Sequence, residues 1–131
     1  MKLVIDASVC VAAITGEAGF QVLDGYDLVA PALMWSECMS VLHANLWRSR
    51  IDRDAAEGAR RRLGEAPVRP SPSAGVLNEA WRLADVLGWA RTYDAEYLAV
   101  ASLERCRLVT LDERLRRGAD RLGFVVTPSE L

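Results

Sequence analysis

The sequence predicts an α/β fold with three layers, in which a short parallel central sheet lies between helices on both sides. Two observations predict this class. Short apolar runs that suit strands alternate along the chain with longer segments of helical periodicity, and parallel strands need such crossover helices to connect them. The length of 131 residues, 51% of them hydrophobic, suits a single domain spanning residues 1–131 with its own core.

Two strands are predicted near the N-terminus. The apolar run over residues 2–6 fits a strand that is buried on both faces, and residues 7–15 are expected to be helical. A short helical piece over 20–23 precedes a second apolar run at 28–30, which Pro31 ends. These two runs are the first strands of the expected sheet.

Two helices are predicted in the middle of the chain. Apolar residues recur at intervals of three and four over residues 33–48, a helical period that places Glu37 in the first turn. The more polar segment 52–65 is expected to be a second helix, with Asp52 as its N-cap and arginines near its end. A proline-rich connection follows and contains a short strand near Val68.

The last third of the chain again alternates helices with strands. Helical periodicity covers residues 74–87, and a further helix opens at Thr92-Tyr93-Asp94 and continues to Glu104. A strand over 107–111, a short charged helix over 112–121 and a final strand over 124–126 complete the pattern.

The basic side chains are almost entirely arginines. Sixteen Lys and Arg residues stand against 18 Asp and Glu residues, a net charge of −2, which by itself does not favour a nucleic-acid partner. Lys2 is the only lysine, so P-loop and Schiff-base chemistry are excluded.

The cysteines and the hydropathy pattern indicate the compartment. Cys10, Cys38 and Cys106 are widely spaced and lack a C-x-x-C motif, so we expect reduced core residues. No charge-free run approaches the roughly 18 residues of a membrane span. Asp6 interrupts the apolar start, unlike the apolar region of a signal peptide. We therefore expect a cytoplasmic protein with no membrane partner.

Four acidic residues are expected at one edge of the sheet. Asp6 and Asp112 each follow a predicted strand, Asp94 begins a helix, and Glu37 lies near the start of another. Because ligands of open α/β sheets bind beyond the carboxyl ends of the strands, these carboxylates can meet there. Their mutual repulsion favours a hard divalent cation such as Mg²⁺ between them. The alternative is that each of them only caps a helix or offsets its dipole.

The segments around these acids resemble those of a known family. They are Val-Ile-Asp-Ala-Ser at 4–8, Ser-Glu at 36–37, Tyr-Asp-Ala-Glu-Tyr-Leu-Ala-Val-Ala at 93–101 and Leu-Val-Thr-Leu-Asp-Glu-Arg-Leu at 108–115. Together they resemble the PIN-domain family, and most closely its VapC-type toxins of bacterial toxin–antitoxin pairs. The resemblance runs almost from end to end and includes the order Asp, Glu, Asp, Asp.

The resemblance implies a ribonuclease that depends on Mg²⁺ or Mn²⁺ and leaves 5′-phosphate and 3′-hydroxyl ends. Its catalytic, metal-binding residues would be Asp6, Glu37, Asp94 and Asp112. Hydroxyl groups often support the site at the positions of Ser8 and Thr110, although both side chains also suit local backbone capping. The implied partners are an RNA substrate, an antitoxin protein and a second copy of the chain, as a homodimer.

Further side chains are candidates for binding RNA or a protein. The arginines that we consider for contact with RNA phosphates are Arg48, Arg50, Arg114 and Arg117. A solvated helix face with acidic neighbours explains the same arginines. Trp47 closes an apolar helix and is a candidate anchor of a partner interface. His43, the only histidine, sits inside an apolar helix and is not expected to be a catalytic base.

Two other functions remain open at this point. An aspartate after the first strand also marks small-molecule phosphohydrolases of the haloacid dehalogenase type, but Asp6-Ala7-Ser8 lacks their Asp-x-Asp pattern and no suitable lysine exists. A non-catalytic module of the same fold, which only binds RNA or protein, is the other alternative. All four acidic positions are filled, so the sequence shows no mark of lost activity.

Overall fold

Five parallel strands form one sheet at the centre of the computed structural model, which describes residues 1–131. The strands lie in the order β3-β2-β1-β4-β5, so that the first strand of the chain is also the middle one. Every neighbouring pair runs parallel. The strands are β1 (Lys2–Ile5), β2 (Asp27–Ala30), β3 (Val68–Pro70), β4 (Arg107–Val109) and β5 (Val125–Val126).

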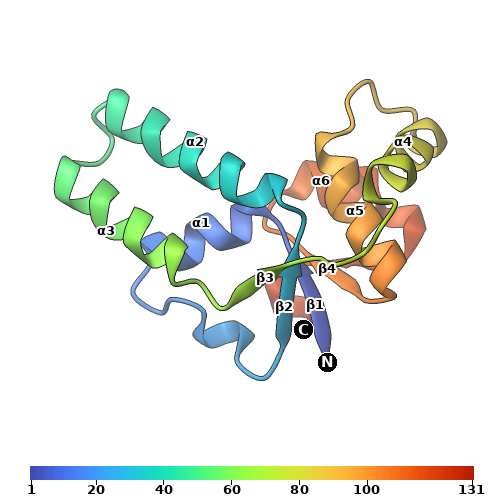
Figure 1. The fold of residues 1–131 in the computed structure, drawn as a ribbon, viewed down its shortest axis with the longest axis horizontal. Coiled ribbons are helices and arrows are strands. Elements are labelled where there is room, and N and C mark those ends of the chain that lie inside the picture. The colour runs from blue at the N-terminus through green and yellow to red at the C-terminus, as the bar shows by residue number, and fades with distance from the viewer.

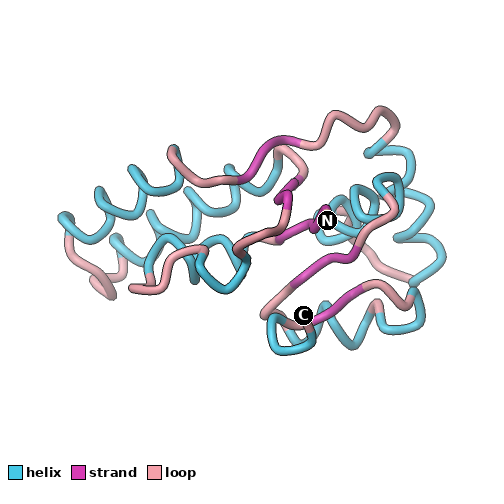
Figure 2. The backbone as a smooth tube through the Cα atoms, turned by 90° about the horizontal axis from the view of Figure 1, so that it is seen from below, coloured by secondary structure: helices cyan, strands magenta, loops and turns pink.

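Helices cover both sides of this sheet. In Figure 1, α1, α2 and α3 lie on one side of the strands and α4, α5 and α6 on the other, and Figure 2 shows the strands between the helices from a second direction. The helices are α1 (Ala7–Thr15), α2 (Leu33–Trp47), α3 (Arg53–Gly64), α4 (Val76–Leu87), α5 (Tyr93–Glu104) and α6 (Glu113–Gly118). None of them has the length and apolar character that crossing a membrane requires. The predicted three-layer α/β fold is confirmed.

The helix predicted over 112–121 is α6 (Glu113–Gly118) followed by a separate 3-10 helix over Asp120–Leu122. Another difference from the predicted boundaries is at the end of β4. The sequence predicts a strand over 107–111, but β4 ends at Val109. The amide of Thr110 still donates to Val126 O of β5 at 3.0 Å. The next two amides bind hydroxyl groups instead of a strand partner, since Leu111 N donates to Ser8 Oγ at 3.0 Å and Asp112 N donates to Thr110 Oγ1 at 2.9 Å. These two hydrogen bonds turn the chain along the edge of the sheet.

The core surrounds β1 and includes most of α5. Residues 3–5 of β1 are fully buried, as expected for a strand that is covered on both faces. In α5, the side chains of Ala95, Ala99 and Ala101 are buried, and their small size lets this helix pack directly on β1 and β4. All three cysteines are free thiols, and two of them are fully buried in this core.

A buried ion pair joins the layers at the amino end of β1. Glu104 has a side chain that is only 4% exposed and accepts hydrogen bonds from Lys2 Nζ and Ser71 Oγ, both at 2.6 Å. Burial alone would raise the pKa of Glu104, but these two hydrogen bonds outweigh burial and hold the pKa below its ordinary value. The single lysine of the chain, Lys2, is therefore paired with Glu104, which lies far from it in the sequence.

Removing this carboxylate should destabilise the protein. We expect Glu104→Ala to lower the free energy of unfolding by about 1–3 kcal/mol, because Ser71 and Lys2 lose a buried partner. Glu57→Ala, which removes an exposed ion pair with Arg60, is the matched control and should cost about 0–1 kcal/mol. Urea unfolding followed by circular dichroism measures both, and equal losses would contradict the structural role of Glu104.

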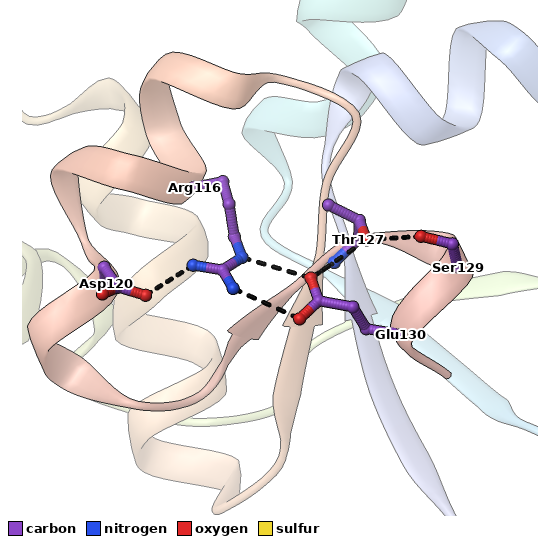
Figure 3. Close-up of polar contacts among 5 residues, drawn as sticks. All are labelled: Arg116, Asp120, Thr127, Ser129 and Glu130. Atoms are coloured by element: carbon purple, nitrogen blue, oxygen red, sulfur yellow. Dashed lines mark hydrogen bonds and ion pairs between the residues drawn. The ribbon is translucent and has the colours of Figure 1, made fainter.

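A second network fixes the C-terminal segment to α6. Figure 3 shows Arg116 of α6 donating hydrogen bonds to both Asp120 and Glu130. Glu130 also accepts from the backbone amide and the hydroxyl of Thr127 at the start of a short 3-10 helix, Pro128–Glu130, which the sequence analysis does not predict. The hydrogen bonds from Arg116, followed by those from Thr127, lower the pKa of Glu130 to about 2.

The stabilising effect of Glu130 should therefore depend on pH. Because its folded pKa lies below the ordinary value of 4.5, its contribution is complete above that value and is lost as the pH falls toward 2. Glu130→Gln should melt at a lower temperature than the unsubstituted protein at neutral pH, and this difference should shrink in acid. Glu65→Gln, which removes no ion pair, is the control. A difference that stays constant with pH would contradict the assignment.

Candidate active site

The carboxyl ends of the central strands bring the predicted acidic residues to one edge of the sheet. Asp6 directly follows β1, and Asp112 lies three residues after β4, its neighbour in the sheet. Glu37 belongs to α2, which follows β2 in the chain. In the sheet, β2 and β4 pair with opposite edges of β1. Asp94 is the second residue of α5, which packs on β1 and β4. The parallel topology thus gathers four carboxylates that are far apart in the sequence.

Helix capping explains only part of this arrangement. Asp6 caps α1 and Asp112 caps α6, each by accepting backbone amide hydrogen bonds with Oδ1. The helix α2 begins at Leu33 as predicted, but Glu37 is its fifth residue and therefore lies in the second turn, which corrects the predicted position in the first turn. Neither Glu37 nor Asp94 accepts a capping hydrogen bond. Asp94 lies in the first turn of α5, where the helix dipole also favours an acid, so Glu37 is the acid whose position neither capping nor the dipole explains.

Asp6 is a buried carboxylate with a full set of donors. It is 5% exposed, and its Oδ1 accepts from Ser8 Oγ at 2.6 Å and from Val9 N at 3.1 Å. Its Oδ2 accepts from Thr110 Oγ1. Burial raises the pKa of Asp6, the three hydrogen bonds oppose this rise, and the charge of Asp112 adds to it.

The two hydroxyl groups that were predicted to support the site link Asp6 to the loop after β4. Ser8 Oγ and Thr110 Oγ1 lie 3.4 Å apart, and both contact Asp6. Each hydroxyl also accepts a backbone amide from this loop, and the amide bound by Thr110 is that of Asp112. The Ser8 and Thr110 hydroxyls therefore do both things that the sequence suggests: they donate to the Asp6 carboxylate and they bind local backbone amides.

Tyr97 holds Glu37, a contact that the sequence analysis misses. The phenol of Tyr97 is buried, and its hydroxyl donates to Glu37 Oε1 at 2.7 Å. Burial and this hydrogen bond raise the pKa of Tyr97, so it stays a donor at neutral pH. The signal in the sequence is its place three residues after Asp94, on the same face of α5. Its apolar neighbours in the same helix indicate a core residue just as strongly, so the sequence alone does not distinguish the two roles of Tyr97.

The carboxylates repel one another. Burial raises the pKa of Asp94, with further contributions from Asp112 and Asp6, while Arg114 acts in the opposite direction. Burial also raises the pKa of Glu37, with Asp94 and Asp6 adding to the rise. Oxygen donors of this kind suit a hard divalent cation. No three of the His, Cys, Asp and Glu side chains stand close enough together to form a ready-made metal site.

A cavity of about 550 Å³ opens beside the carboxylates. Glu37, Asp94 and Asp112 line it, whereas the more deeply buried Asp6 does not. The cavity is also lined by the loop between α4 and α5, by the first residue of α5 and by Arg114 of α6. Three acidic side chains therefore face a space that is open to solvent and large enough to admit part of a substrate.

Of the other predicted residues, only Arg114 lies at this cavity. Arg48 caps the C-terminus of α2, about 16 Å from Glu37 along the helix axis, and Arg50 follows in the turn to α3. Arg117 is exposed on α6 and does not line the cavity. Trp47 is 79% exposed and shares a separate groove on α2 with Arg48 and the side chain of His43.

Comparison with known proteins agrees in sequence and in structure. The sequence profile of the PIN domain matches residues 3–121. A VapC ribonuclease of Mycobacterium bovis and ribonuclease VapC9 of Mycobacterium tuberculosis are each 34% identical to this chain over an alignment of 119 residues. The alignment covers 86% of this chain and 87% of the relative.

Solved structures share the fold at lower sequence identity. PAE2754 from Pyrobaculum aerophilum superposes with a TM-score of 0.75 at 23% identity, over 99% of this chain and 85% of the other. A toxin–antitoxin complex from Klebsiella pneumoniae contains a chain with a TM-score of 0.68 at 18% identity, over 96% of this chain and 97% of the other. The length of the profile match and the identity to the curated relatives show that this chain belongs to the PIN domain family.

Proposed function

We propose that this protein is a VapC-type endoribonuclease, the toxin of a toxin–antitoxin pair, and that it hydrolyses RNA phosphodiester bonds with the aid of Mg²⁺ or Mn²⁺. The observation that carries this proposal is the cavity into which Glu37, Asp94 and Asp112 converge, next to the buried Asp6. The ribonuclease activity named for the curated relatives supports it.

The four acids have different parts in this reaction. We assign direct cation binding to Asp94 and Asp112, which line the cavity and, unlike Asp6, are exposed. Glu37, whose Oε1 is occupied by Tyr97, presents its other oxygen for a cation or for orienting water. Asp6, the remaining predicted metal ligand, does not line the cavity, and we propose that its negative charge acts on the cation from its buried position. A bound divalent ion supplies the chemistry that these residues lack, which is activation of water and neutralisation of phosphate charge.

The phosphohydrolase alternative fits this site less well. A covalent mechanism of that type needs a free carboxylate oxygen as nucleophile. Both oxygens of Asp6 accept hydrogen bonds, and the carboxylate is buried away from the cavity. The only lysine, Lys2, pairs with Glu104 at the other end of β1. These contacts favour hydrolysis by water over a phosphoaspartate intermediate.

We propose an antitoxin protein and a second copy of this chain as partners, and Trp47 as an anchor of the homodimer. The solved structures that share this fold include toxin–antitoxin complexes, which supports the antitoxin. Trp47 exposes 79% of its surface beside a groove along α2. An exposed tryptophan next to a groove is a common centre of binding energy in protein interfaces.

Cleavage of RNA tests the proposed function. With purified protein and structured RNA, we expect cleavage that requires Mg²⁺ or Mn²⁺ and stops with a chelator. Asp94→Asn should lower the rate by more than about 100-fold, since even the outer partners of metal sites are typically worth 10- to 100-fold. Because the substitution also relieves repulsion from Asp112 and Asp6, the variant should melt at the same temperature as the original protein or at a higher one.

The control for this experiment is Asp85→Asn, which changes an exposed aspartate of α4 that does not line the cavity. Its cleavage rate should equal that of the unsubstituted protein. Undiminished cleavage by Asp94→Asn would refute the assignment of the site, and metal binding without cleavage of any RNA would favour the non-catalytic alternative.

The role of Trp47 is tested separately. Trp47→Ala should raise the dissociation constant of the homodimer about 30-fold or more, the loss expected when a central interface side chain is truncated. Sedimentation equilibrium measures this constant. Trp81→Ala, an exposed tryptophan on α4, provides the comparison. A dissociation constant that Trp47→Ala leaves unchanged would show that Trp47 does not anchor the dimer.

A further inference from the structure

The cavity beside the carboxylates is also lined by aromatic and cationic side chains that metal binding does not use, and these are called here the aromatic and cationic wall. Trp89 and Arg91 come from the loop between α4 and α5, Tyr93 is the first residue of α5, and Arg114 belongs to α6. The carboxylates explain how a phosphate could be attacked. They do not explain why two aromatic rings and two guanidinium groups share the same cavity.

Tyr93 does not contribute its side chain to the hydrophobic core. Its side chain is 57% exposed and is not among those packed against the core, although it directly precedes Asp94. Tyr97, one turn further along α5, is fully buried and holds Glu37. The two tyrosines of α5 thus differ completely in environment, and the ring of Tyr93 is left open to a ligand in the cavity.

The two arginines that line the cavity form no close ion pair, although the charge of Arg114 acts to lower the pKa of Asp94. None of the ion pairs in the structure involves a residue that lines the cavity. The cationic members of these pairs are Lys2, Arg53, Arg60, Arg69, Arg82 and Arg116. Arg91 and Arg114 are in none of them, and both are exposed. Positive charge at the rim therefore remains available for an anionic ligand such as a phosphodiester.

Trp89 gives this wall a fixed position. A Cβ atom added at Gly118 would stand 3.2 Å from Cζ2 of Trp89, so the indole packs closely against the backbone of α6. Trp89 is half-buried and also contacts the core. The loop that carries Arg91 is therefore held by α6, and aromatic rings and cations line the same cavity as the three acids.

We propose that Tyr93 is a substrate-binding residue on whose ring an unpaired nucleobase next to the cleaved phosphate stacks, while Arg91 and Arg114 bind the adjoining phosphates. This assignment rests on the proposed ribonuclease function and adds the residues that select the substrate. Stacking needs an open base face, which single-stranded nucleotides present and paired nucleotides inside a duplex do not.

Equilibrium binding tests the assignment without relying on catalysis. In the cleavage-deficient Asp94→Asn background, fluorescence anisotropy is measured with a short labelled single-stranded RNA and with the same strand paired to its complement. We expect Tyr93→Ala to weaken binding of the single strand about 5- to 150-fold, the range for loss of one stacked base, and to leave duplex binding unchanged. Tyr93→Phe, which keeps the ring, should restore the affinity.

Two further variants sharpen this measurement. Trp81→Ala removes an aromatic ring that is 68% exposed on α4 and does not line the cavity, and it should bind RNA normally. Arg91→Ala should reduce the slope of log affinity against log salt by about 0.7, the value for one phosphate contact on a single strand. Equal losses for Trp81→Ala and Tyr93→Ala, or equal losses on single and double strands, would overturn the stacking role.

Cleavage of abasic substrates then identifies the stacked base. Single bases are removed in turn on either side of the mapped cleavage site, and kcat/KM is measured with the protein and with Tyr93→Ala. At one position, loss of the base should lower kcat/KM about 5- to 150-fold for the protein and should have no further effect in Tyr93→Ala. Identical profiles for the two proteins would overturn the assignment. Absence of cleavage by the unsubstituted protein would instead refute the proposed function, and the binding experiment would still decide the role of Tyr93.

Discussion

The buried carboxylate of Asp6 at the end of the central strand is the constraint on which the rest of the site depends. An ionised carboxylate inside a protein is costly unless hydrogen bonds satisfy it. Ser8, Val9 and Thr110 supply these donors. Because the Thr110 hydroxyl also accepts the backbone amide of Asp112, satisfying Asp6 simultaneously ends β4 and places a second acid at the rim. The hydrogen bonds of Thr110 therefore both fold this loop and bring two acids of the site together.

The clustered carboxylates of the site also destabilise the folded protein. Burial raises the pKa of Asp6, Glu37 and Asp94, and nearby carboxylates add to each rise, so the folded protein holds charges that repel one another. The opposite end of β1 compensates with an ion pair between Lys2 and Glu104. A sheet with a paired charge network at its amino end and carboxylates that repel one another at its carboxyl end is the pattern expected of an α/β fold that binds a charged ligand.

Much of the fold and the positions of the acids follow from the sequence, because both depend on periodicity and on parallel topology. Alternating apolar runs and helical segments predict the layers, and carboxyl ends of parallel strands gather Asp6 and Asp112. The contact of Tyr97 with Glu37 could not be predicted, since it depends on how α2 and α5 pack across the sheet. Arg114 at the cavity is a predicted candidate for contact with RNA, but Trp89 and Arg91 are not, because both lie in a loop, where no periodicity indicates the direction of a side chain.

The most direct test of the account is calorimetric titration of the protein with Mn²⁺. The repulsion among the carboxylates predicts binding at millimolar concentrations or tighter, with loss of the signal when Asp94 is replaced by Asn, because that acid lies in the cavity and is coupled to both Asp6 and Asp112. Absence of heat at millimolar Mn²⁺, or equal binding by the protein and the Asn variant, would contradict the claim that this edge of the sheet is a metal-dependent active site.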